Sequence, residues 1–190
     1  TNQLGFIGGI QNSIIDQFEY GYRAGVALGA KERHVNIDVQ AQYAQSWSDA
    51  AKAKQIALKM YSNGCDIIFH AAGQSGNGMI EAAKDLNKWA IGVDSDQSSL
   101  APDNILTSAL KRVDNAICSI SKKLMEGDTT IFGKNHEFGL AEDGVGIPEN
   151  NKNMDPAVYQ KAMELKQKVK DGKITPPLNQ QQFQEYLKTL

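Results

Sequence analysis

Residues 3–125 alternate between short apolar stretches and longer segments with helical periodicity, and this alternation limits the fold classes open to the chain. The expected strands are 4–7, 35–41, 65–71, 89–93 and 105–109, and the expected helices are 13–28, 50–61, 79–87 and 111–125. Parallel strands need crossover connections, and helices usually supply them. The sequence therefore predicts an α/β fold with a parallel sheet flanked by helices.

The rhythm changes after residue 125. Segments 138–140 and 145–147 lie on either side of Asp143-Gly144, a dipeptide typical of β-hairpin turns. A charged amphipathic helix is expected over 156–169, and a short final helix over 180–190. This part of the chain is therefore expected to add a hairpin and two helices to the parallel sheet.

Composition and charge exclude several classes of protein. The chain has 190 residues, of which 41% are hydrophobic and 22% charged, as in ordinary globular proteins, and it contains no stretch suited to a membrane span. Its net charge of −2 and the lack of a basic run argue against binding to nucleic acid. Cys65 and Cys118 show no metal-binding or redox spacing, so both are expected to be small buried side chains, with a disulfide as the alternative.

Glycines cluster where the third strand meets the third helix. Gly73, Gly76 and Gly78 follow the order G-x-x-G-x-G, which is neither the dinucleotide fingerprint nor a phosphate loop. Such a junction can present backbone N–H groups to a ligand, or it can simply make the turn. A second set of glycines, at 21, 25 and 29, predicts close packing of the first helix on the sheet.

Ligands of open parallel sheets bind beyond the carboxyl ends of the strands, where the loops converge. The loops here offer an aromatic ring, amides, carboxylates and an ammonium group, carried by Trp47, His70, Gly73, Gln74, Asp94, Asp96 and Lys111. A flat ring suits stacking, and a carboxylate can accept hydrogen bonds from adjacent sugar hydroxyls. This set fits a nucleoside or a ring-stacked sugar.

Each of these residues also has a purely structural interpretation. Trp47 could cover the core, and a phenylalanine at the end of a strand, such as Phe69, is usually a core residue. Asp94 and Asp96 could accept hydrogen bonds within a turn or cap a helix, and Lys111 could be a solvated charge on the first turn of a helix.

Catalysis finds little support in the sequence. The histidines stand at positions 34, 70 and 136, outside any zinc-protease motif, and no nucleophile elbow occurs. Asp94 and Asp96 form a D-x-D pair that lacks the further oxygen ligands of a calcium loop. We therefore expect no enzymatic activity, no metal site and no cofactor.

Six segments together carry a resemblance to a known family. They read GFIGG, YAQSWSDAAKAKQIA, DIIFHAAGQSGNGMIEAAK, AIGVDSDQ, ILTSALKRVDNAI and DGVGI. In combination they resemble the basic membrane lipoprotein family, the nucleoside-binding proteins of ABC importers of the purine nucleoside receptor A type. The resemblance extends over nearly the whole chain, as far as VKDGKITPP.

The resemblance implies a type I periplasmic-binding fold that closes on a purine nucleoside without chemistry. Phe69 would stack on the purine, and the backbone at Gly73 and Gln74 would approach the sugar. Asp94 would accept from the ribose hydroxyls, joined by Lys111, while Trp47 occupies an aromatic position of the family's loop that can lie outside the pocket. The implied partners are guanosine, inosine or adenosine and an ABC permease in the membrane.

This sequence departs from the family pattern in one respect. Family members are expected to carry about a hundred residues ahead of the GFIGG segment, and this sequence does not contain them. Residues 1–118 are then expected to be a near-complete Rossmann-like ligand-binding lobe, and residues 119–190 a segment of the other, truncated lobe. This truncation leaves apolar surface exposed on the C-terminal portion, which predicts self-association or disorder there. The resemblance also implies a location at the cell surface or on the periplasmic side of the plasma membrane, with a lipid anchor on an N-terminal segment absent from this sequence. A nucleoside-sensing regulatory domain of the same fold is the alternative function.

Overall fold

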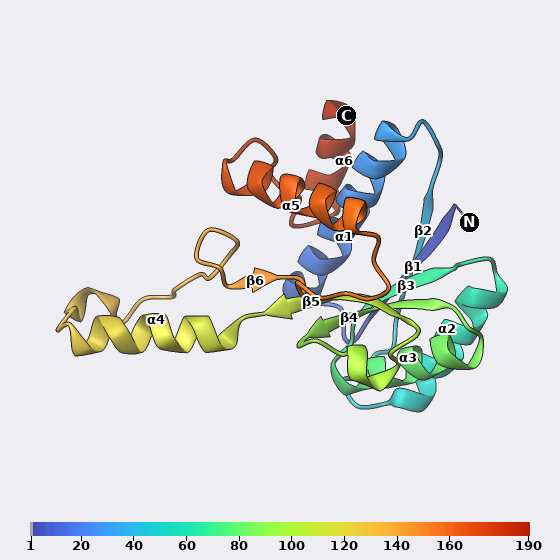
Figure 1. Ribbon diagram of the computed structural model, residues 1–190, viewed down its shortest axis with the longest axis horizontal. Helices are drawn as coiled ribbons and strands as arrows, with labels where there is room; N and C mark the ends of the chain where they lie inside the picture. Colours follow the sequence, from blue (N-terminus) through green and yellow to red (C-terminus); the bar gives the residue numbers. More distant parts are fainter. Residues whose placement is uncertain (1) are drawn as a thin grey trace.

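A computed structural model describes residues 2–190. These residues contain one six-stranded sheet, whose arrangement can be followed in Figure 1. In spatial order the strands are β2 (Asp38–Tyr43), β1 (Gln3–Gly8), β3 (Ile67–Ala71), β4 (Trp89–Asp94), β5 (Ile105–Lys111) and β6 (Val145–Gly146). The first five are parallel, and only the short β6 runs antiparallel to its neighbour β5. The predicted α/β class with a parallel sheet is confirmed.

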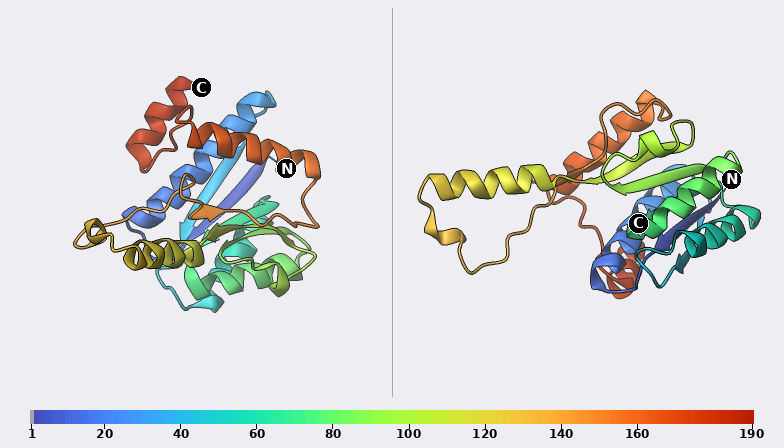
Figure 2. Two further views of the ribbon diagram at one scale, coloured as in Figure 1. Left: turned by 60° about the vertical axis from the view of Figure 1, so that its left-hand side comes forward. Right: turned by 90° about the horizontal axis from the view of Figure 1, so that it is seen from below.

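Helices cover both faces of the sheet (Figures 1 and 2). One face carries α2 (Ala50–Ser62) and α3 (Gly76–Asp85), and the other carries α1 (Ser13–Glu32). The two C-terminal helices, α5 (Pro156–Lys170) and α6 (Gln180–Thr189), lie on the α1 side, where Lys161 pairs with Glu32 and Phe183 contacts Tyr20. Residues 2–190 also contain three short 3-10 helices: η1 (Gly73–Ser75), η2 (Ser98–Leu100) and η3 (Thr129–Ile131).

The core has two halves because successive side chains of a strand point to opposite faces. Ile7 and Ile68 pack under α2 and α3 with other buried apolar residues. Their neighbours along the strands, Phe6 and Phe69, pack under α1. The sheet is therefore buried on both faces, as expected for a parallel sheet.

The predicted division of the chain falls at residue 118 and stays a prediction. That residue lies in the middle of α4 (Val113–Met125), which projects away from the sheet and leads into a long return segment (Figures 1 and 2). Residues 145–190 then rejoin the first lobe, because β6 pairs with β5 and α6 packs on α1. The projecting part is thus confined to about 113–144.

The predicted β-hairpin around Asp143-Gly144 is wrong. A turn is present, since the Gly144 N–H donates to the Gly139 carbonyl oxygen over 2.8 Å, but residues 138–140 form no strand. Val145 pairs instead with Lys111 of β5. On α4 the apolar side chains of Val113, Ile117 and Met125 are exposed, which is in keeping with the expected self-association; that remains a prediction.

The two cysteines have different environments. Cys65 is fully buried and Cys118 is exposed on α4, and neither forms a disulfide. The expectation of two small buried residues is therefore confirmed for Cys65 and wrong for Cys118. Burial also raises the pKa of the Cys65 thiol, which lowers its thiolate fraction at neutral pH.

We expect iodoacetamide at neutral pH to modify Cys118 alone in the native chain, because alkylation requires an accessible thiolate. Cys65 should react only after the chain unfolds. Intact mass after timed exposure, with and without denaturant, measures this. Two modifications at equal rates in the native chain would contradict the burial of Cys65.

Within residues 2–190 no helix is long and apolar enough to span a bilayer. In the same residues, no three or more histidine, cysteine, aspartate or glutamate side chains lie together in a group that could hold a metal ion.

Candidate functional site

Loops from neighbouring strands meet at the carboxyl edge of the sheet, which is where the sequence predicts that a ligand binds. The loop after β2 carries Trp47, η1 after β3 carries Gly73 and Gln74, and Asp94 and Lys111 end β4 and β5. Because strands in a sheet lie about 5 Å apart, the loops of β3, β4 and β5 are immediate neighbours. The structure therefore gathers five of the six predicted residues along one edge.

Trp47 lies on the rim of this edge, with 41% of its surface exposed. Its ring covers the backbone at Gly9, where an added Cβ would come within 2.3 Å of the ring carbons. The Ser75 N–H donates to the Trp47 carbonyl oxygen over 3.1 Å, so the Trp47 loop is fixed to η1. The indole is therefore a partly open aromatic surface held in place by two loops.

Gly73 and Gln74 form η1, directly ahead of α3. Gly73 has a φ of +56°, a conformation that glycine adopts without steric cost, and a Cβ there would meet the Trp47 carbonyl oxygen at 3.1 Å. Gln74 is exposed. α3 begins at Gly76, three residues before the expected start, so its N-terminus lies closer to the edge than predicted.

Asp94 and Lys111 form an ion pair, with 2.9 Å between Lys111 Nζ and Asp94 Oδ1. Both side chains are about half exposed. The Lys111 ammonium also lies 5.1 Å from the centre of the Phe18 ring, a cation–π arrangement. Lys111 is the last residue of β5 and not, as expected, a residue in the first turn of a helix. The pair presents charged donors and acceptors to solvent at the edge.

Phe69 does not join this group. Its side chain is only 6% exposed, and its ring contacts Phe6, Phe18 and Tyr22 between the sheet and α1. Phe69 therefore lies in the core under α1 and not on the open edge, and its stacking on a purine stays a prediction. The open aromatic ring is Trp47 instead.

His70 is a strand-end residue that the structure buries completely. Its Nε2 lies 2.9 Å from Gln97 Oε1, and burial lowers the pKa of the imidazole despite the opposing influence of Asp94. Sequence reasoning missed Gln97, although it closes the IGVDSDQ segment on which the resemblance rests.

Acidification should destabilise the fold through His70. Since the folded pKa lies below the unfolded value of about 6.5, the unfolded chain binds the proton more readily as the pH falls through that value. We expect the free energy of unfolding to be lower at pH 5.5 than at pH 7.5. Urea midpoints at both pH values measure the change. His70→Gln should abolish most of it, whereas His34→Asn, at an exposed position, should keep it; an unchanged pH response in His70→Gln would contradict this account.

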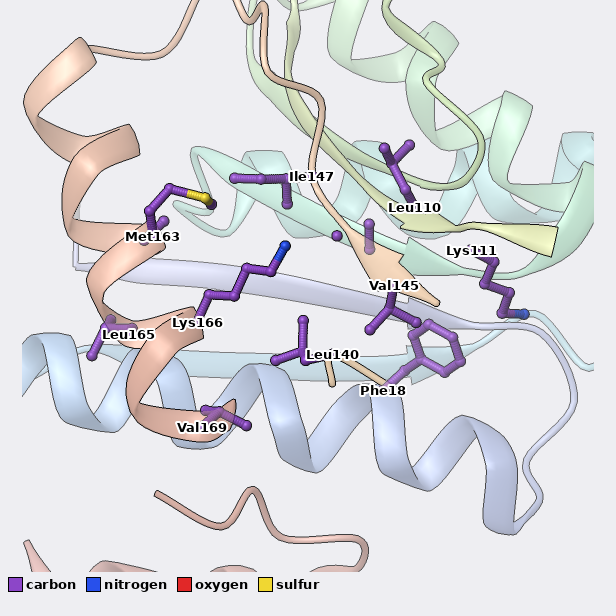
Figure 3. A pocket seen from close by; sticks show the side chains of 13 residues that line it. Phe18, Leu110, Lys111, Leu140, Val145, Ile147, Met163, Leu165, Lys166 and Val169 are labelled. Atoms are coloured by element: carbon purple, nitrogen blue, oxygen red, sulfur yellow. The ribbon is translucent and has the colours of Figure 1, made fainter. Parts of the chain in front are cut away.

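A cavity of about 470 Å³ lies beside the edge, between β5, β6, α1 and α5 (Figure 3). Its walls are mostly apolar and come from residues far apart in the sequence, which explains why sequence reasoning did not find it. The residues labelled in the figure are Phe18, Leu110, Lys111, Leu140, Val145, Ile147, Met163, Leu165, Lys166 and Val169. Polar groups are scarce there, and the Lys166 ammonium is already 3.5 Å from Asp143. The cavity is therefore mainly apolar, and the charged side chains in its lining are Lys166 and Lys111, the second of which it shares with the edge.

Comparison with known proteins identifies the family. The model of the family described as "ABC transporter substrate-binding protein PnrA-like" matches residues 1–180. The chain belongs to this PnrA-like family. It is 40% identical to basic membrane protein D of Borreliella burgdorferi over 98% of the chain, and 42% identical to the CD4+ T-cell-stimulating antigen of Listeria innocua over 93%. The resemblance seen in the sequence is confirmed.

The PnrA-like chain spans only about half of these relatives, 55% of the first and 53% of the second. Among solved structures, it superposes on an ABC transporter solute-binding protein from Aeropyrum pernix with a TM-score of 0.82 at 23% identity, covering 98% of this chain and 62% of that one. It also superposes on a transcriptional activator of the comK gene from Bacillus halodurans with a TM-score of 0.76 at 22% identity, covering 93% of this chain and 59% of that one. At these identities the structures establish the fold, which is of the type I periplasmic-binding kind.

Proposed function

We propose that this chain is the ligand-binding lobe of an ABC importer's substrate-binding protein and holds a purine nucleoside at the carboxyl edge of its sheet. The ion pair of Asp94 with Lys111 is the observation that carries the proposal, because a half-exposed carboxylate with its neighbouring ammonium can hydrogen-bond the vicinal hydroxyls of a ribose. The nucleoside leaves unchanged, since the edge offers a binding set without an acid/base arrangement.

Trp47 supplies the aromatic surface in this proposal, in place of Phe69. Its half-exposed ring can stack on a flat base, and Gly73 allows the backbone to approach the ligand closely. In this proposal the base binds at the loops that follow β2 and β3, and the sugar binds at the ends of β4 and β5. Guanosine, inosine and adenosine are the proposed ligands.

The partners and location follow from the family and belong to the proposal. A substrate-binding protein of an ABC importer delivers its ligand to a membrane permease on the outer side of the plasma membrane. We propose that the longer protein is held there by a lipid anchor.

Isothermal titration of guanosine, inosine, adenosine and free ribose into the 190-residue chain tests the proposed function. We expect saturable binding of at least one purine nucleoside and much weaker binding of ribose, because ribose lacks the base that stacks on Trp47. The nucleoside should be recovered intact by mass analysis. Absence of saturable nucleoside binding, or cleavage of the glycosidic bond, would contradict the proposal.

A further inference from the structure

Asp94 adopts an uncommon backbone conformation. Its φ is +68°, and the N–H of Ser95 donates to the Val93 carbonyl oxygen over 2.8 Å. These two features describe a three-residue turn with a positive central φ, which is rare and strained. Such a conformation persists only where the surrounding structure determines it. The contacts that hold this turn come largely from one side chain, that of Gln97.

Gln97 ties the ends of three strands together. Its Oε1 accepts from the Val93 N–H over 2.9 Å and lies 2.9 Å from Nε2 of His70 on β3. Its backbone N–H donates to Ser108 Oγ on β5 over 3.1 Å. The side chain folds back over Gly92, where an added Cβ would lie 2.7 Å from Gln97 Oε1. Both sides of the Asp94 turn are therefore fixed by the same residue.

The proton positions in this cluster follow from the bonding. A backbone N–H can only donate, so the Gln97 atom facing Val93 is the amide oxygen, and His70 must donate to it from Nε2. Nδ1 of His70 then carries no proton, and it is buried without a hydrogen-bond partner among residues 2–190. Burial lowers the pKa of His70, which agrees with a neutral ring. The neutral ring thus supports Gln97, which in turn holds the turn.

We propose that Gln97 is a positioning residue for ligand recognition, holding Asp94 in its strained turn so that the carboxylate faces Lys111 and the sugar hydroxyls. This inference rests on the proposed function for its ligand. Gln97 itself acts through Asp94, since its side-chain oxygen is fully engaged within the sheet edge. Its loss should therefore affect recognition of the sugar hydroxyls more than recognition of the base.

The test compares guanosine with 2′,3′-dideoxyguanosine, which keeps the base and lacks both hydroxyls. Gln97→Met has a similar shape without the acceptor, and we expect it to weaken guanosine binding at least tenfold while leaving the dideoxy analogue within twofold. Gln97→Glu keeps an acceptor oxygen and should restore most of the preference for guanosine. Gln55→Met, at an exposed position of α2, is the matched control and should change neither affinity. Equal losses for both ligands, or no loss, would overturn the proposal.

A second measurement needs no ligand and separates this inference from the proposed function. Amide hydrogen exchange of Ser95 reports the turn directly, because its N–H closes the hydrogen bond to Val93. In Gln97→Met we expect Ser95 to exchange at least tenfold faster, with exchange in α2 unchanged. If the native chain binds no nucleoside but Ser95 responds in this way, the proposed ligand is wrong and the positioning of Asp94 stands. Unchanged exchange at Ser95 would overturn the positioning role.

Discussion

Gly78→Ala should lower the free energy of unfolding by about 3 kcal/mol, the upper end of the usual cost of overfilling a core. Gly78 lies on α3 where that helix crosses α2, and an added Cβ would lie 1.8 Å from the Ala50 carbonyl oxygen and 3.0 Å from the Lys54 backbone nitrogen. These are backbone atoms, so no side chain can rotate away to make room. The two helices would have to separate.

The interface between α2 and α3 magnifies this cost because it is built from small residues. Ala53 and Ala57 on α2 and Ala82 on α3 are fully buried, so the two helices approach closely. Separating them would open gaps along this face and lose dispersion contacts that a close-packed interior needs. The substitution therefore acts on the whole half of the core under α2 and α3.

Gly21→Ala is the matched control, since both glycines lie within helices. At Gly21 on α1, an added Cβ would meet no atom within 4 Å, so the change should raise stability by up to about 1 kcal/mol through helix propensity alone. For a chain of this size we expect Tm to fall by roughly 6–12 °C in Gly78→Ala and to rise by roughly 2–4 °C in Gly21→Ala. Calorimetry measures both. A Gly78→Ala chain with native stability would show that α2 and α3 are not in close contact.

The glycines also show what a sequence pattern can and cannot reveal. Gly21, Gly25 and Gly29 follow a four-residue repeat that predicts close packing, and this prediction is wrong, since an added Cβ at each meets nothing within 4 Å. Gly78 has no repeat to mark it, yet it carries the closest backbone contact. Helical spacing fixes which residues share a face, but the distance to the neighbouring element depends on tertiary packing.

The strands and the edge residues were predictable for a simple physical reason. A parallel sheet brings the carboxyl ends of its strands together, so residues that follow strands in the sequence become neighbours in space. Asp94 and Lys111 meet in this way, although 16 residues separate them. Phe69 could not be placed by the same argument, because β3, which reads IIFHA, shows no alternation of apolar and polar residues that would indicate which side chains face α1.

The role of Gln97 lay beyond sequence reasoning because its contacts depend on a side chain folding backwards over Gly92. The path of residues 126–144 was equally unpredictable. The Asp143-Gly144 dipeptide marks a turn correctly, but strand pairing depends on the tertiary structure, and Val145 pairs with β5.

Asp94→Asn should abolish most of the nucleoside affinity that we propose for the chain. Asparagine has the same shape and tolerates a positive φ, so it can keep the backbone at +68°. The substitution removes the negative charge that pairs with Lys111 and accepts from the ribose hydroxyls. Hydrogen bonds to charged groups contribute about 1.5–3 kcal/mol, which corresponds to a loss of roughly 10- to 150-fold in affinity.

Asp96→Asn separates this charge effect from a general change in the loop. Asp96 lies two residues away in the same loop and is also exposed, but its Oδ1 accepts from the Ser98 N–H over 3.0 Å at the start of η2, a bond that an asparagine oxygen can also make. Titration of guanosine into both variants should show a large loss for Asp94→Asn and less than a twofold change for Asp96→Asn. The free energy of unfolding should change by less than about 1 kcal/mol in either variant, because the Asp94–Lys111 ion pair and the Asp96–Ser98 hydrogen bond both lie at exposed side chains. Equal affinities of the two variants for guanosine would mean that the charge of Asp94 does not contribute to binding of the sugar. Lys111 would then have to bind the ligand without help from that charge.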